Sequence, residues 1–125
     1  MILVDTSVWI GHWRSAHALL QKILEDEQVL MHPFVIGELA CGQMKNRKEI
    51  IALLHALPQA RKADDDEILF FIDRHRLMGR GLGLVDAHLL ATAHIESAQL
   101  WTMDKKLHAL ANELHCAFTP VATAQ

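Results

Sequence analysis

The stretch Met1–Ile10, MILVDTSVWI, decides the fold prediction. Residues 1–4 form a short apolar run that predicts a buried strand, and Asp5 follows where this strand should end. Thr6 and Ser7 come next, ahead of a helical pattern. In open α/β sheets the carboxyl ends of the strands border the crevice where ligands bind. We therefore predict that Asp5 is a functional carboxylate.

The rest of the chain alternates short β-like runs with helical patterns, which favours an α/β fold. Strands are predicted at about 2–5, 29–31 and 100–102, with an added edge strand at 117–118. Helices are predicted at about 7–13, 16–26, 33–42, 46–56, 64–77, 85–97 and 105–114. We expect a three-layer α/β/α sandwich with a short parallel sheet, formed by one domain over residues 1–120 and followed by a flexible tail at 121–125.

Composition excludes several classes of protein. Half of the 125 residues are apolar, which is too many for a disordered chain. The longest apolar runs fall short of the about 18 residues that a membrane span needs, and the N-terminus lacks the basic start of a signal peptide. Two cysteines, Cys41 and Cys116, are too few for a disulfide framework. We expect a cytoplasmic protein that does not bind membranes.

Three further acids, Glu38, Asp86 and Asp104, stand at places comparable to that of Asp5. At an effective dielectric of about 20, two like charges about 4 Å apart repel by roughly 4 kcal/mol, so four converging carboxylates need a cation. Oxygen ligands suit Mg²⁺ and Mn²⁺, which predicts a divalent-metal site and phosphodiester cleavage. The formal net charge of the chain is -3. The four acids together carry -4, so the rest of the chain has a net charge of +1. Net charge therefore does not exclude RNA as a partner.

Each acid also has a structural explanation. Asp86 heads the apolar stripe of its predicted helix, and there it could be only a helix-terminal acid. Glu38 is expected to point inward, where it could pair with a lysine or arginine. Asp104 stands where a helix N-cap belongs, and Asp5 could be a turn residue. The four alternatives explain each acid separately but not why all four stand where the elements of one sheet should meet.

Other residues are weaker candidates. Thr6, Ser7 and Thr102 could hold the carboxylates or a bound water by hydrogen bonds, or could serve only as local caps. Arg80, in the glycine-rich loop 79–83, could contact RNA phosphate or be merely solvated. The nine histidines lack the spacing of a zinc site.

No aromatic platform for RNA bases is evident in the sequence. Tyrosine is absent, and Trp9, Trp13 and Trp101 are expected in the core. The RNA target is therefore left open.

The segments ILVDTSVWI, FVIGELACG, GLVDAHLLATA and LWTMDKKL together resemble the PIN domain, and within it the VapC-type toxin ribonucleases of bacterial toxin–antitoxin pairs. The resemblance covers nearly the whole chain. It implies that Asp5, Glu38, Asp86 and Asp104 form a Mg²⁺ or Mn²⁺ site, and it matches the family's hydroxyls to Thr6-Ser7 and Thr102. No extra acid follows Asp104, which leaves open whether one or two metals bind.

The resemblance also implies a function and partners. The expected activity is that of a toxin endoribonuclease, which cuts RNA by in-line attack of metal-activated water. The expected partners are a VapB-type antitoxin, operator DNA bound through that antitoxin, and a second copy of the chain in a homodimer. The apolar helices at 7–26 are candidates for the dimer surface or for the antitoxin groove.

Two alternatives belong to other classes of protein. A receiver-type signalling domain is also a small Mg²⁺-binding α/β domain, but it needs an acidic pair after its first strand and an acid at the end of a middle strand. A catalytically idle PIN-like binding module would keep the acids without cleaving RNA. Incubation with an acyl phosphate donor, and with structured RNA plus Mn²⁺, distinguishes the three functions.

Overall fold

The computed structural model describes residues 1–120, and the predicted tail at 121–125 lies outside the described residues. The strands are β1 (Ile2–Val4), β2 (Val29–Leu30) and β3 (Gln99–Trp101). The helices are α1 (Thr6–Arg14), α2 (Ala18–Glu25), α3 (Pro33–Cys41), α4 (Arg47–Ala56), α5 (Asp65–Arg74), α6 (Leu84–Ile95) and α7 (Lys105–Glu113). The predicted α/β class is confirmed, and most helix ends lie within two residues of their predicted positions.

The sheet is parallel, and β1 lies at its centre. Leu3 of β1 pairs with Leu30 of β2 on one side and with Leu100 of β3 on the other, which gives the order β2-β1-β3. The chain therefore crosses from one side of β1 to the other between β2 and β3. Ligands of open α/β sheets bind at the carboxyl ends of the strands beside such a reversal. Asp5 follows the central strand and so stands at this place.

Two short segments widen the sheet at its edges. Gln59 forms a parallel bridge with Met31 after β2, and Ala117 forms a parallel bridge with Leu100 of β3. The second bridge confirms pairing at the predicted edge position near 117–118, although the contact is a single bridge. The first bridge was not predicted. It brings the segment between α4 and α5 alongside β2, running in the same direction.

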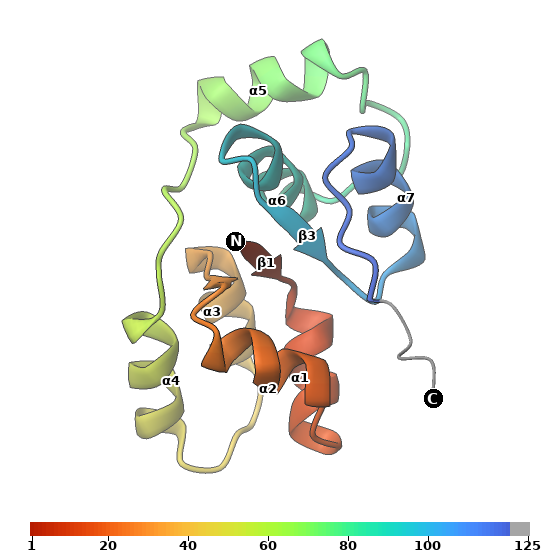
Figure 1. The fold of residues 1–125 in the computed structure, drawn as a ribbon. Helices are drawn as coiled ribbons and strands as arrows, with labels where there is room; N and C mark the ends of the chain where they lie inside the picture. The colour runs from red at the N-terminus through yellow and green to blue at the C-terminus, as the bar shows by residue number, and fades with distance from the viewer. Residues whose placement is uncertain (121–125) are drawn as a thin grey trace, which may run out of the picture.

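The helices cover the sheet on both sides. In Figure 1, α5, α6 and α7 occupy the upper half of the molecule and α1 to α4 the lower half, with β1 and β3 between them. The core includes Leu3 and Val4 of β1, together with Leu89 and Leu90 of α6, all of which are fully buried. Alternation along a strand would bury only every second residue. Helices on both faces therefore explain why β1 is apolar throughout.

The tryptophan prediction is partly wrong. Trp9 and Trp101 are buried as predicted, but Trp13 is 39% exposed near the end of α1. The ring of Trp13 leans against Trp9 at 6.4 Å between ring centroids and otherwise reaches the surface. None of the helices in residues 1–120 is long and apolar enough to cross a membrane.

Candidate functional site

Asp5 lies at the carboxyl end of β1, between the ends of its two neighbouring strands. Its backbone N–H donates to the carbonyl of Trp101, the last residue of β3, at 2.9 Å. Only 7% of the residue is exposed. Asp5 is the N-cap residue of α1, but its side chain makes no capping hydrogen bond. Its role as a turn residue therefore does not explain where the carboxylate points.

Two hydroxyl groups hold one oxygen of this carboxylate. Ser7 Oγ and Thr102 Oγ1 each donate to Asp5 Oδ2 at 2.8 Å. The same hydroxyls accept the backbone N–H groups of Met103 and Asp104, both at 3.0 Å. Because each hydroxyl proton is directed at Asp5, the carboxylate receives two charge-assisted hydrogen bonds. Ser7 and Thr102 thus contact a carboxylate and also close the turn at Met103 and Asp104, and their role in a metal site stays a prediction.

Glu38 reaches the site from α3, but not as predicted. Thr6 Oγ1 donates to Glu38 Oε1 at 2.7 Å, which confirms that Thr6 contacts one of the four acids. The expectation that Glu38 points inward is wrong, because the residue is exposed. Within residues 1–120 it pairs with no lysine or arginine, so the predicted structural alternative for Glu38 is absent there.

Asp104 and Asp86 occupy the first turns of two helices. Asp104 caps α7, because its Oδ1 accepts the N–H of Leu107 at 2.9 Å, and so the capping explanation holds for one of its two oxygens. Asp86 is the third residue of α6, and Gly83 is the N-cap. Among the described residues, the Asp86 carboxylate has no hydrogen-bond partner in the side-chain network around Asp5.

The electrostatics of Asp86 indicate that the four acids converge. Its pKa is raised to about 6, first by burial and then by the negative charges of Asp5, Asp104 and Glu38. Burial of a carboxyl group disfavours its charged form, and nearby like charges add to that effect. Side chains from four separate segments therefore act on one another at the carboxyl edge of the sheet.

The acids converge without forming a closed coordination shell. Within residues 1–120, no three histidine, cysteine, aspartate or glutamate side chains are placed to hold one ion together. The donor chemistry nevertheless fits a hard divalent cation, because all four groups offer oxygens. A cation would also remove the repulsion that raises the pKa of Asp86.

Arg80 makes a contact that the sequence did not indicate. Its guanidinium binds the carboxylate of Glu113 through two hydrogen bonds, at 2.6 and 3.0 Å. This pair ties the glycine-rich loop to the last turn of α7. The contact of Arg80 with RNA stays a prediction. An RNA phosphate would have to compete with the Glu113 carboxylate for the Arg80 guanidinium.

An aromatic cluster beside the acids was also missed. Phe34 contacts the rings of two buried histidines, His32 and His88, at centroid separations of 5.2 and 4.7 Å. Lys62 Nζ stands 5.3 Å from the centre of the Phe34 ring. These residues come from three different segments, so no local spacing pattern could indicate their contact. The position of His32 at the end of β2 was the one available signal.

A protein-family model and two curated relatives match this chain. The model of the PIN domain matches residues 2–113. "Ribonuclease VapC32" of two Mycobacterium tuberculosis strains, CDC 1551 / Oshkosh and ATCC 25618 / H37Rv, is 48% identical over 126 residues. These alignments cover 100% of this chain and 98% of each relative.

Two solved structures share the fold. PAE2754 from Pyrobaculum aerophilum matches with a TM-score of 0.66 and 19% identity, over 94% of this chain and 87% of that one. A chain of FitAB bound to an IR36 DNA fragment matches with a TM-score of 0.63 and 18% identity, over 90% of this chain and 91% of that one. At these identities the likeness concerns the fold alone.

Proposed function

This chain belongs to the PIN domain family, and we propose that it is the toxin of a toxin–antitoxin pair, an endoribonuclease that depends on Mg²⁺ or Mn²⁺. The chain is 48% identical in sequence to Ribonuclease VapC32 over its whole length, and it therefore belongs among the VapC-type proteins. This membership argues against the receiver-type alternative. The sequence after β1 agrees, because it has one acid where a receiver domain needs a pair.

The 48% identity to Ribonuclease VapC32 carries the proposal, and the raised pKa of Asp86 supports a metal site within it. Three other carboxylates contribute to this raised pKa, so the acid after β1, the acids on α3 and α6, and the acid that caps α7 lie in one region. A structural role would favour pairing these acids with cations of the chain. The three ion pairs within residues 1–120 instead involve other acids, Asp26, Glu67 and Glu113. We infer that the partner of the four acids is a divalent cation.

In the proposed mechanism, Asp5, Glu38, Asp86 and Asp104 would hold the ion. When bound, a divalent cation supplies an acidified water for in-line attack and neutralises charge on the phosphoryl oxygens. Ser7 and Thr102 orient Asp5 by holding Oδ2, which leaves Oδ1 for other contacts. Thr6 orients Glu38 in the same way. No side chain is needed as a covalent nucleophile.

Purified protein should cut structured RNA in the presence of Mn²⁺ and should stop when EDTA is added. Expression of the wild-type chain should arrest growth, and sequencing of RNA ends after brief expression should reveal the target. Asp5→Asn, which removes the charge that both hydroxyls hold, is the matched inactive control. Harmless expression together with uncut RNA would instead support the catalytically idle binding module.

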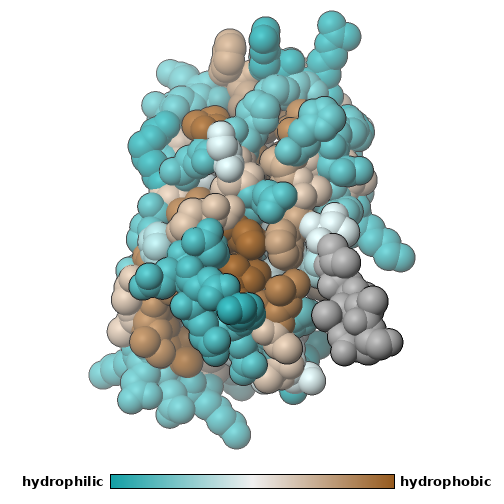
Figure 2. Space-filling model, viewed as in Figure 1, coloured by the Kyte–Doolittle hydropathy of each residue, from teal (hydrophilic) through white to brown (hydrophobic). Residues whose placement is uncertain are grey.

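An apolar groove suits the antitoxin partner. Trp9, Trp13 and Leu24 line one side of it from α1 and α2, the helices singled out in the sequence. Ile50 and Leu53 line the other side from α4, and the groove measures about 410 Å³. Figure 2 shows hydrophobic side chains at the surface in the lower part of this face, where Figure 1 places α4. We propose that an amphipathic helix of a VapB-type antitoxin lies here.

Leu53→Glu should weaken antitoxin binding by at least about tenfold, because a charge placed in an apolar groove loses its hydration without gaining a partner. Leu53 is 63% exposed, so the substitution should leave the fold and RNA cleavage intact. The assay is the affinity of the co-expressed small antitoxin, with relief of growth arrest as a second measure. Phe70→Glu, 70% exposed on α5, is the control and should bind antitoxin normally. Equal antitoxin binding by both variants would show that the antitoxin binds at another surface.

The remaining partner predictions stay proposals. We propose a homodimer, for which light scattering at tens of micromolar is the direct measurement. Contact with operator DNA is expected only through the antitoxin. A cytoplasmic location is proposed because the RNA substrate and the antitoxin are expected there.

A further inference from the structure

Phe34 carries a half-buried aromatic ring on α3, the helix that supplies Glu38. It stands one helical turn before Glu38 on α3, and residues four apart on a helix share a face. Its ring makes an edge-on contact with His88, which lies two residues after Asp86 on α6. The Phe34 ring thus connects α3 with α6, the helices that supply Glu38 and Asp86.

Lys62 reaches the same place from the segment between α4 and α5. Gln59 pairs in parallel with Met31, and the N–H of Ala60 donates to the Met31 carbonyl at 2.7 Å. A chain that runs parallel to β2 leaves the sheet at the same edge as β2 does. Lys62 therefore emerges at the carboxyl edge, and its Nζ lies 5.3 Å from the Phe34 ring centre.

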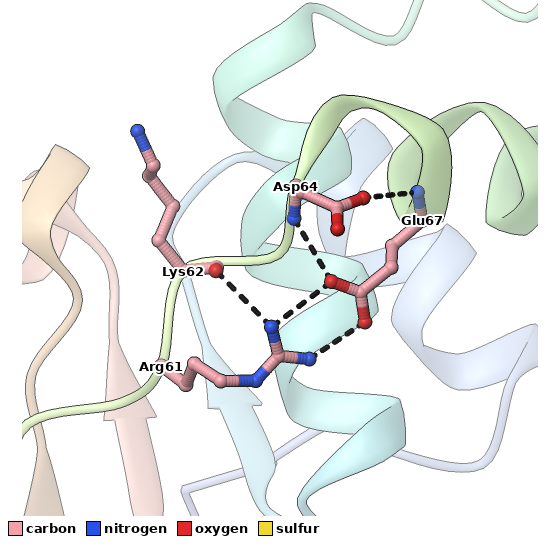
Figure 3. Close-up of polar contacts among 4 residues, drawn as sticks. All are labelled: Arg61, Lys62, Asp64 and Glu67. Carbon is pink, nitrogen blue, oxygen red and sulfur yellow. Dashed lines mark hydrogen bonds and ion pairs between the residues drawn. The ribbon is translucent and has the colours of Figure 1, made fainter.

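Both side chains are attached to rigid supports. His32 is fully buried, and its Nδ1 accepts the backbone N–H of Phe34 at 2.9 Å, which fixes the start of α3. Arg61 binds the Lys62 carbonyl at 3.5 Å and the Glu67 carboxylate at 2.6 and 2.9 Å. In Figure 3 the Lys62 side chain extends away from this network. Its ammonium group has no ion-pair partner within residues 1–120.

We infer that Phe34 and Lys62 form a nucleotide subsite, in which an unpaired RNA base stacks on the Phe34 ring and Lys62 binds the adjoining phosphate. The inference rests on the proposed function and specifies single-stranded RNA as the substrate. His32 and His88 are buried and support the ring from the interior. Lys62 is exposed and covers the ring from the solvent side.

Exchange of Lys62 for a base is favourable at this ring. A cation over an exposed aromatic ring is held weakly, whereas stacking of a nucleic-acid base on such a ring is stronger. The flexible stem of Lys62 lets its ammonium move from the ring to a phosphate. A base held on Phe34 would place the strand beside Glu38 and Asp86. The subsite would thus select unpaired RNA and position its backbone at the acids.

The test compares Phe34→Leu, Phe34→Trp and Lys62→Gln in cleavage of a labelled single-stranded RNA. Phe34→Leu should raise KM by about tenfold with little change in kcat, while Phe34→Trp should retain or improve KM because it keeps a stacking surface. Lys62→Gln should raise KM most at low salt, and the increase should shrink as the salt concentration rises. In the Asp86→Asn background, where RNA is bound but not cut, it should also reduce the salt slope of log Kd by about 0.7.

Matched controls separate the subsite from general damage. Phe70→Leu on α5 and Lys48→Gln on α4 make the same changes at exposed positions away from Phe34, and both should behave like wild type. A duplex of the same RNA should be insensitive to Phe34→Leu. An unchanged KM and Kd in Phe34→Leu would overturn the subsite, and so would equal losses in the Leu and Trp variants.

The outcomes also distinguish this inference from the proposed function. If wild type cuts RNA but Phe34→Leu equals it, the subsite is wrong and the function stands. If wild type binds RNA without cutting it, and Phe34→Leu binds about tenfold more weakly, the subsite stands and the nuclease proposal is wrong. Absence of any RNA binding by wild type would overturn both.

Discussion

Replacing Asp86 by asparagine is expected to reduce RNA cleavage by orders of magnitude without destabilising the metal-free protein. Asp86 carries a charge that burial and three other acids disfavour, as its pKa of about 6 indicates. Asparagine keeps the size of the side chain and removes this charge. Without metal, the variant should be as stable as wild type or more stable. With Mn²⁺ it should gain less stability, because the native state binds the ion more weakly.

The stability gained by the Asp86→Asn variant over metal-free wild type should increase as pH rises. The pKa of Asp86 rises from 3.8 in the unfolded chain to about 6 in the folded protein. Well below pH 3.8 the side chain is protonated in both states and contributes nothing. As pH rises toward 6, the unfolded state loses this proton first, so metal-free wild type loses stability. The asparagine variant lacks this loss, and its stability relative to wild type should grow from pH 4 to neutral pH.

A purely structural role for Asp86 predicts a different result. A charge in the first turn of a helix stabilises it by at most about 1 kcal/mol through the dipole, and its loss should lower stability slightly. Cleavage and the response to Mn²⁺ would then survive. Melting curves of both proteins in EDTA and in Mn²⁺, together with one RNA assay, distinguish the roles. If Mn²⁺ stabilises the variant as much as wild type, and the variant cleaves RNA at the wild-type rate, Asp86 is not part of the metal site.

The sequence was sufficient for those features that depend on local pattern. The apolar run before Asp5 predicted that this residue ends a strand. The apolar stripe after Asp86 predicted that this residue begins the buried face of a helix. Both predictions were possible because burial and periodicity show in patterns of a few residues. The hydroxyls of Ser7 and Thr102 were also identified in advance. The sequence did not indicate which carboxylate they hold, and the structure shows that it is Asp5.

Features that depend on packing between distant segments were not predictable in this way. Glu38 is exposed because α3 turns its face toward Thr6 rather than into the core. Trp13 lies at the end of α1, where neighbouring helices leave it partly uncovered. The contact between Phe34 and Lys62 requires the unpredicted bridge at Gln59. In each case the apolar pattern predicts which face of a helix or strand is apolar, but it does not predict which neighbouring segment covers that face.

Thr102→Val is expected to lower cleavage by about 10- to 100-fold, the usual cost of losing a group that orients a metal ligand. Thr102 is 7% exposed, and its hydroxyl both donates to Asp5 and accepts the N–H of Asp104. Valine keeps the shape and removes both hydrogen bonds. Ser7 then holds Asp5 alone, and the turn that carries Asp104 loses one of the two hydroxyls that anchor it. Loss of this partner for the part-buried N–H of Asp104 should also lower stability, by about 1 kcal/mol.

Two further variants separate orientation of the acids from simple packing. Thr102→Ser keeps the hydroxyl and should retain most of the activity. Thr92→Val makes the same change at another buried threonine, whose hydroxyl has no hydrogen-bond partner within residues 1–120. Because that polar atom is buried without a partner, its removal should leave cleavage unchanged and stability equal or higher. Wild-type cleavage by Thr102→Val would show that Asp5 needs no hydrogen bond from Thr102. The Thr102 hydroxyl would then serve only to close the turn between β3 and α7.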